Sequence, residues 1–184
     1  MVRRYLADAF GVLTCCFRAK ALIVDFVCDN RRVRISAKAD YAVRAALELA
    51  AAEGDQPVKG SHLAESQGIP LQFLEHILLE MKHARLIQAR RGARGGYWLA
   101  RPASEITVAD VIRAVEGPLA NIHEAAPEDL HYEGAAERLR DVWVAVRHNI
   151  RAVLESVTLD ELAAGHLPWQ IDAMLNDPQT WLKR

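Results

Sequence analysis

The chain has 184 residues, 26% of them charged, and a formal net charge of −1 at neutral pH. This length allows one domain with appendages and a core of useful size. Its three cysteines all lie within residues 1–32, which excludes a disulfide-stabilised scaffold and favours a cytoplasmic setting. The net charge is +3 over residues 33–103 and −7 over residues 104–184, a division typical of a nucleic-acid-binding head on an interaction body.

Residues 1–32 do not fit the pattern of the remaining chain. Their apolar stretch is interrupted by Arg18, Lys20 and Asp25, so it is too short and too charged to cross a bilayer. It has no clear small-residue cleavage site, so a secretory signal is not predicted. We interpret residues 1–32 as an N-terminal extension that is disordered or reflects a mis-assigned start, with translation beginning at Val33. We expect no membrane partner.

Three helices are predicted next. Ser36 is a suitable N-cap for a helix that runs to about Glu53. Ser61 is expected to cap a short helix over residues 62–67, which Gly68 ends. The third helix spans about residues 70–84, with Pro70 in its first turn and apolar residues recurring on one face. Two short helices joined by a tight turn that contains glycine form a helix-turn-helix.

A basic hairpin follows, with strands predicted at residues 86–90 and 97–99. The residues between Arg90 and Tyr97 include Arg91 and Arg94 together with three glycines, which permit a tight turn with positive φ. Between residues 81 and 104 there is no Asp or Glu, so the arginines are free to reach a phosphate or enter a minor groove. The alternative is an ordinary basic hairpin on a solvated surface. The order of elements predicts a winged helix-turn-helix DNA-binding domain over residues 33–103.

Residues 104–184 are predicted to be helical and to serve dimerisation and effector response. Thr107 and Asp110 form a capping box for a helix that Gly117 ends, and residues 119–134 are loop-like. A long helix is expected over about residues 135–157. Its apolar stripe consists of Leu139, Val142, Trp143, Val146, Ile150, Val153, Leu154 and Val157.

A stripe of this length usually needs a partner surface. We expect a second copy of the chain, because two-fold symmetry matches a palindromic operator, with packing on the chain's own head as the alternative.

The segments 35–45, 68–78, 92–100 and 106–112 resemble the Rrf-type winged-helix transcriptional regulators, whose members include the sensors IscR and NsrR and the repressor CymR. The resemblance implies a mainly α fold, a homodimer and a bacterial, cytoplasmic regulator that is usually a repressor. It places Lys38 and Tyr41 near the DNA backbone, and it places the start of the recognition helix at residues 70–75. The residues expected to bind DNA are Lys38, Tyr41, Pro70, Gln72, Phe73, Glu75, Arg90, Arg91, Arg94, Gly95 and Gly96.

Two polar residues of the recognition helix are suited to base readout. Gln72 can pair bidentately with adenine, and Glu75 can accept from a cytosine amine. Either could instead be a solvated helix residue.

The chain departs from the cluster-bearing members of this family in the loop 119–134. Those members have three closely spaced cysteines there, whereas this loop has none, so we expect no iron–sulfur cluster and no other cofactor. His123 and His131 leave a metal as an alternative, although scattered histidines are common in acidic loops. The resemblance to the branch without a cluster implies control by a partner enzyme of cysteine synthesis or by a small-molecule effector.

An enzyme is not predicted, because the chain has no glycine-rich phosphate loop, no HExxH motif and no recognisable nucleophile. The leading hypothesis is a homodimeric repressor that binds double-stranded DNA. The alternative is a protein-interaction adaptor that uses the winged-helix fold without specific DNA binding.

Overall fold

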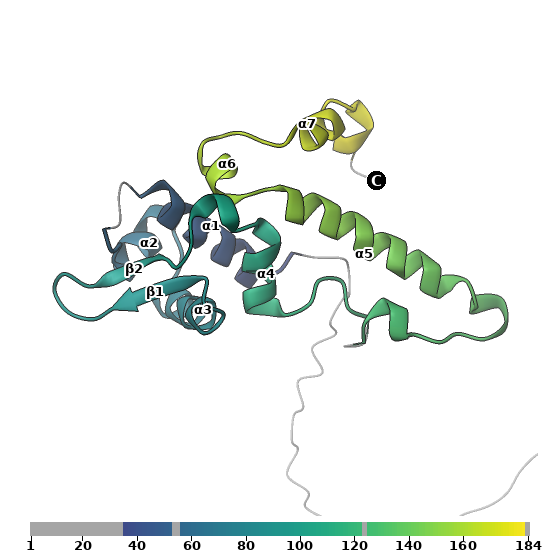
Figure 1. Cartoon of the computed structure of the whole chain (residues 1–184), viewed down its shortest axis with the longest axis horizontal. Helices are drawn as coiled ribbons and strands as arrows, with labels where there is room; N and C mark the ends of the chain where they lie inside the picture. The colour runs from purple at the N-terminus through teal and green to yellow at the C-terminus, as the bar shows by residue number, and fades with distance from the viewer. Residues whose placement is uncertain (1–34, 53–55, 123–124, 183–184) are drawn as a thin grey trace, which may run out of the picture. The chain divides into compact units, whose positions relative to one another are not determined.

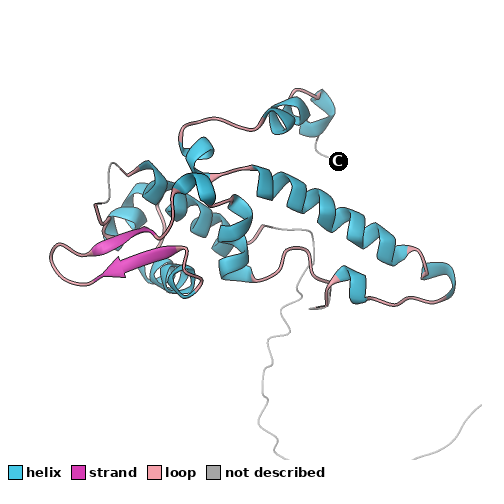
Figure 2. Ribbon diagram, in the orientation of Figure 1, coloured by secondary structure: helices cyan, strands magenta, loops and turns pink. Residues whose placement is uncertain are grey.

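The computed structural model describes residues 35–52, 56–122 and 125–182, which are mainly helical with one small antiparallel sheet (Figures 1 and 2). The predicted extension over residues 1–32 lies outside the described residues. The elements in chain order are α1 Ala37–Ala51, α2 Gly60–Gln67, α3 Leu71–His83, β1 Ile87–Arg90, β2 Gly96–Leu99, η1 Ala103–Glu105, α4 Val108–Glu116, η2 Pro127–Asp129, η3 Gly134–Ala136, α5 Leu139–Ser156, α6 Leu159–Ala163, α7 Trp169–Leu175 and η4 Pro178–Trp181. No helix in these described ranges is long and apolar enough to span a bilayer.

The helix-turn-helix forms as predicted, with corrections at its helix ends. The Ser36 hydroxyl accepts from the backbone N–H of Ala39 and caps α1. The prediction that Ser61 caps the second helix was wrong: α2 begins at Gly60, and its N-cap is Lys59, which makes no side-chain cap. Gly68 ends α2 with φ of 62°, a conformation that favours glycine. Pro70 is the N-cap of α3 and lies just before its first turn.

The wing is a short antiparallel hairpin of β1 and β2. Its register pairs Gln88 with Trp98 and Arg90 with Gly96. A further backbone bridge joins Val58 to Tyr97, with N–O distances of 2.9 and 2.8 Å in the two directions. The segment before α2 therefore holds one edge of the wing, and the turn between the strands lies at the end of the hairpin (Figure 2).

The core lies where α1 packs against α3, α4 and α6. Alanines on the inner face of α1 let the neighbouring helices approach closely, while larger apolar side chains fill the space between them. The main buried residues are Ala42, Ala45, Ala46, Leu63, Leu74, Ile77, Leu78, Met81, Ile106, Val111 and Leu159. Helices α4 and α6 share this core with α1, so the core crosses the predicted boundary between residues 103 and 104. That boundary therefore remains a proposal about function.

The long helix is shorter than expected. The predicted range was about 135–157, but α5 begins at Leu139, after the separate 3₁₀ turn of η3. Gly134 has φ of 61° and Glu133 is extended, so this stretch does not continue the helix toward its N-terminus. At the other end Val157 is extended, and its carbonyl accepts from the Val108 N–H at 3.0 Å.

The C-terminal end of α5 is fixed to the head by short backbone contacts. The Leu159 N–H donates to the Ile106 carbonyl at 2.9 Å, and a bridge joins Thr107 to Thr158. Each of these threonines begins a helix with a capping box, and the Thr107–Asp110 box was predicted from sequence. This junction links the helix-turn-helix head to the long helix.

Candidate nucleic-acid interface

The exposed face of α3 is the first part of the candidate interface. Leu74, Ile77, Leu78 and Met81 are buried, so the opposite face points outward. Gln72 and Glu75 are exposed, as predicted for groove-facing residues. Helical geometry adds His76 and Leu79 to this outward face, and both are exposed. Neither residue was predicted as a DNA contact, although a position opposite the apolar stripe of the helix identifies both.

Two aromatic residues predicted to bind DNA are in direct contact. The rings of Tyr41 on α1 and Phe73 on α3 meet edge to face, with centroids 5.7 Å apart and an interplanar angle of 84°. The Arg44 guanidinium carbon lies 5.6 Å from the centre of the Tyr41 ring, and its Nε donates to Gln67 Oε1 at 2.9 Å. Helices α1 and α3 therefore form one continuous surface, which these contacts stabilise.

Lys38 forms an ion pair within the protein. Its Nζ lies 2.7 Å from a carboxylate oxygen of Glu80 on α3, and both side chains are partly exposed. A partly exposed pair of this kind is weak. If Lys38 binds a DNA phosphate, that phosphate therefore replaces the Glu80 carboxylate at a small cost in free energy.

The wing presents its arginines in two different ways. Arg90 Nη2 donates to the Arg94 carbonyl at 3.0 Å, so this side chain braces the turn. Arg91 and Arg94 are exposed, and among the described residues neither forms an ion pair. These two cations are the wing groups available to a phosphate.

The wing glycines provide space for the backbone. A Cβ on Gly95 would lie 2.2 Å from the Arg90 carbonyl oxygen, and one on Gly96 would lie 2.5 Å from the Val58 carbonyl oxygen. Gly92 has φ of 107°, which gives the turn the positive φ that the sequence predicted. Gly95 and Gly96 thus shape the wing, and the structure gives them no further role.

Within the described residues, the apolar stripe of α5 is only partly covered. None of the helix residues is buried, and Val142 and Val146 are 51% and 37% exposed. Val157 does not share this face: it lies beyond the helix and is buried with Val108 and Ile112. Its predicted place in a dimerisation surface is therefore corrected, because the head already covers it. Leu154 also packs partly against that cluster.

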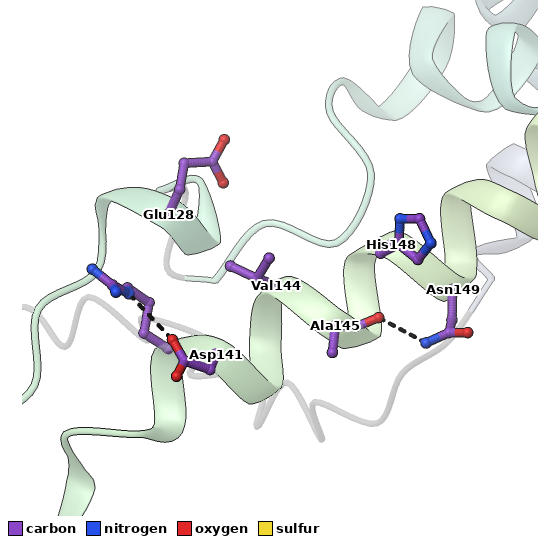
Figure 3. A pocket seen from close by; sticks show the side chains of 7 residues that line it. Glu128, Asp141, Val144, Ala145, His148 and Asn149 are labelled. Carbon is purple, nitrogen blue, oxygen red and sulfur yellow. Dashed lines mark hydrogen bonds and ion pairs between the residues drawn. The ribbon is translucent and has the colours of Figure 1, made fainter.

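The short helix η2 contacts α5, and an open hollow of about 570 Å³ lies between Glu128 of η2 and one face of α5 (Figure 3). Its lining includes Glu128 from the loop and Arg140, Asp141, His148 and Asn149 from α5. Glu128 pairs with Arg147. A backbone hydrogen bond, followed by the hydrogen bond from Arg147, lowers the pKa of Glu128 below its ordinary value.

Comparison with known proteins gives consistent relatives. A family profile described as "Rrf2: Iron-dependent Transcriptional regulator" matches residues 35–165. The chain is 47% identical over 145 residues to Rv1287 of Mycobacterium tuberculosis, named as an HTH-type transcriptional regulator, covering 79% of this chain and 90% of that protein. It is 33% identical over 132 residues to the HTH-type transcriptional regulator CymR of Bacillus subtilis, covering 72% and 91%.

Solved structures agree with these sequence relatives. The structure of CymR, the global cysteine regulator of B. subtilis, aligns with a TM-score of 0.62 at 31% identity, covering 74% of this chain and all of that one. The T. potens IscR structure aligns with a TM-score of 0.56 at 30% identity, covering 83% and 93%. These relatives are described as regulators, in line with the prediction that the chain is not an enzyme.

The family description names iron, but residues 33–184 lack the thiolates that an iron–sulfur cluster needs. Iron–sulfur clusters are held mainly by cysteine thiolates, and residues 33–184 contain no cysteine. In the described part of the chain no three His, Cys, Asp or Glu side chains gather to hold a metal. These residues do not fit a thiolate-held cluster. Cys15, Cys16, Cys28 and His123 lie outside the described residues.

Proposed function

The chain belongs to the Rrf2 family of transcriptional regulators, and on that premise we propose that it is a homodimeric repressor that binds a palindromic operator. The observation that carries this proposal is the pairing of an exposed α3 face with a wing whose Arg91 and Arg94 have no ion-pair partner in the described chain. A winged fold needs both parts to hold a duplex.

In this proposal α3 enters the major groove, because that groove admits a helix and presents a distinct pattern for each base pair. Gln72 and Glu75 would read base edges, with His76 beside them on the same exposed face. The wing would follow the backbone or enter the minor groove, whose negative potential attracts arginine. Such a regulator would act in the bacterial cytoplasm, where its operator is.

A second copy of the chain would cover the α5 stripe. Val142, Val146 and Trp143 lie on one face of the helix, and the Trp143 indole N–H is shielded from solvent with no hydrogen-bond partner among the described residues. Two such helices packed together would remove these apolar side chains from water. The dimer would then present two α3 helices to two half-sites.

Control would come from a metabolite or a partner enzyme of cysteine synthesis. The hollow beside α5 is lined by Glu128, Arg140 and His148, which suit a small polar molecule (Figure 3). The similarity to CymR, the global cysteine regulator of B. subtilis, supports cysteine metabolism as the setting. An effector of this kind would act by binding the DNA-bound and free conformations unequally.

Fluorescence anisotropy on the chain's own promoter DNA, across a salt series with nonspecific competitor, tests DNA binding directly. We expect tight binding by two protomers per site that weakens steeply with salt, because each phosphate contact releases counterions. Replacing Arg91 and Arg94 with alanine removes four cations from a dimer. The slope of log K against log salt should then become shallower by up to about 3.6.

Arg138→Ala is the matched control, since this exposed arginine precedes α5 and lies outside the proposed interface. It should leave both affinity and slope unchanged. Unchanged binding by the Arg91→Ala, Arg94→Ala variant would contradict the role of the wing. The adaptor alternative would be favoured if no promoter fragment binds more tightly than nonspecific DNA. This comparison is made with and without cell extract to supply an effector.

A further inference from the structure

Helix α3 exposes three large apolar side chains. Leu71 and Phe73 are each 42% exposed and Leu79 is 49% exposed, while other apolar residues of the helix fill the core. Leu71 and Phe73 lie in the first turn of the helix, the part that contacts base edges in a helix-turn-helix. Leu79 is seven residues after Gln72 and shares its face.

The Phe73 ring is held in place before any ligand arrives. The Phe73 ring contacts the Tyr41 ring edge to face. The Arg44 guanidinium lies over the Tyr41 ring and donates a hydrogen bond to Gln67. The remaining part of the Phe73 ring is open to solvent. A side chain fixed in this way loses little rotamer freedom on binding, so its contact energy is largely retained.

An apolar side chain in the major groove cannot use the hydrogen-bond pattern of the bases. The C5-methyl group of thymine is the apolar feature that this groove presents. We propose that α3 reads thymine methyl groups in the operator, with Phe73 as the main contact and Leu79 as a second. This inference rests on the proposed function. Specificity then combines hydrogen bonds from Gln72 and Glu75 with apolar readout from their neighbours.

Deoxyuridine tests this proposal, because it keeps the hydrogen-bonding groups of thymine and lacks only the methyl group. The full chain is first used to select its tightest site from a pool of random duplexes. That site is then made with thymine or with deoxyuridine at every thymine position. We expect about fourfold weaker binding for one lost methyl contact, and about fifteenfold for one in each half-site.

Variants assign the effect to residues. Phe73→Ala should bind the thymine duplex more weakly and lose most of the difference between the two duplexes, whereas Phe73→Leu should keep part of it. Trp169→Ala, which removes an aromatic side chain that is 75% exposed on α7, should keep the whole difference. Circular dichroism melting checks that each variant folds, and Leu79→Ala provides a second test if Phe73→Ala does not.

Equal affinity of the wild-type chain for both duplexes would overturn the inference while leaving DNA binding intact. So would a deoxyuridine penalty that persists in full in both Phe73→Ala and Leu79→Ala, since the methyl group would then act through DNA shape. Unchanged DNA affinity in these variants would indicate that the apolar residues serve a protein partner. If selection yields no site tighter than competitor DNA, the proposed function itself fails, which is a different result.

Discussion

At the tip of the wing, the position of Gly95 has no room for a side chain. A Cβ there would meet three backbone atoms, the nearest 2.2 Å away, and backbone cannot rotate aside as a long side chain can. The same turn carries Arg91 and Arg94, so the shape of the turn sets where the guanidinium groups point.

Gly95→Ala should therefore open the turn and lower the free energy of unfolding by about 1–3 kcal/mol. DNA affinity should fall as well, because the arginines are displaced. Thermal denaturation and fluorescence anisotropy measure the two effects. Ala93→Ser, at an exposed position of the same turn, is the control and should change neither. Wild-type stability of Gly95→Ala would show that the turn has another accessible conformation.

Residue contacts of this kind were predictable only in part. The arginines and glycines of the wing are adjacent in sequence, so their shared turn could be inferred. The contacts of Tyr41 with Phe73 and of Lys38 with Glu80 join α1 to α3. They depend on how these two helices cross, and no local pattern encodes that crossing.

At the scale of elements, α4 and α5 are joined by charged side chains. Glu155 on α5 accepts from Arg113 on α4, and Arg151 Nε donates to the same carboxylate at 3.0 Å. The hydrogen bond from Arg113, followed by that from Arg151, lowers the pKa of Glu155 below its ordinary value of 4.5. A carboxylate whose pKa falls on folding stabilises the fold above its unfolded pKa, and this stabilisation is lost as pH falls through the folded value.

Glu155→Gln should accordingly cause a small decrease in melting temperature at pH 7. As the pH falls below 4.5, the wild-type carboxylate takes up a proton and the two melting temperatures should converge. Glu137→Gln, at an exposed site with no ion pair among the described residues, should match the wild type throughout. A difference that stays constant down to pH 3 would mean that the amide disturbs packing and that charge is not the cause.

The ends of elements show where sequence reasoning succeeds. Both threonine capping boxes are local patterns, and the Thr107–Asp110 box was predicted correctly. The limits of α5 were not, because the apolar spacing of three and four continues through Val157 although the helix ends at Ser156. The backbone hydrogen bond between Val157 and Val108 and the burial of Val157 beside Ile112 show that this valine belongs to the head.

At the scale of the whole molecule, α5 is fixed to the head at its C-terminal end and exposes apolar side chains along its length. Its C-terminal end is tied to the head through Thr107, Thr158 and the Glu155 ion pairs. Its exposed stripe lies toward solvent along the helix. If the stripe pairs with a second copy, the junction transmits that pairing to the head and fixes the distance between the two α3 helices.

Val146→Glu tests the pairing. Val146 is 37% exposed, so the single chain can hydrate a glutamate there, whereas a paired helix would have to bury it without a partner. Light scattering should show a dimer for the wild type and, for the variant, a monomer that keeps its melting cooperativity. Ala145→Glu adds the same charge at an exposed position away from the stripe and should remain dimeric.

The spacing between half-sites then reports whether the junction is rigid. One base pair added between the half-sites rotates them by about a tenth of a turn and separates them by about 3.4 Å. A dimer with fixed α3 helices should lose about tenfold or more in affinity, since one half-site contact must break or the DNA must deform. The Val146→Glu monomer should bind more weakly overall and be indifferent to the added base pair. A wild-type dimer that tolerates several added base pairs would show that the heads move freely about α5, and the tie between Val108 and Val157 would then not set operator spacing.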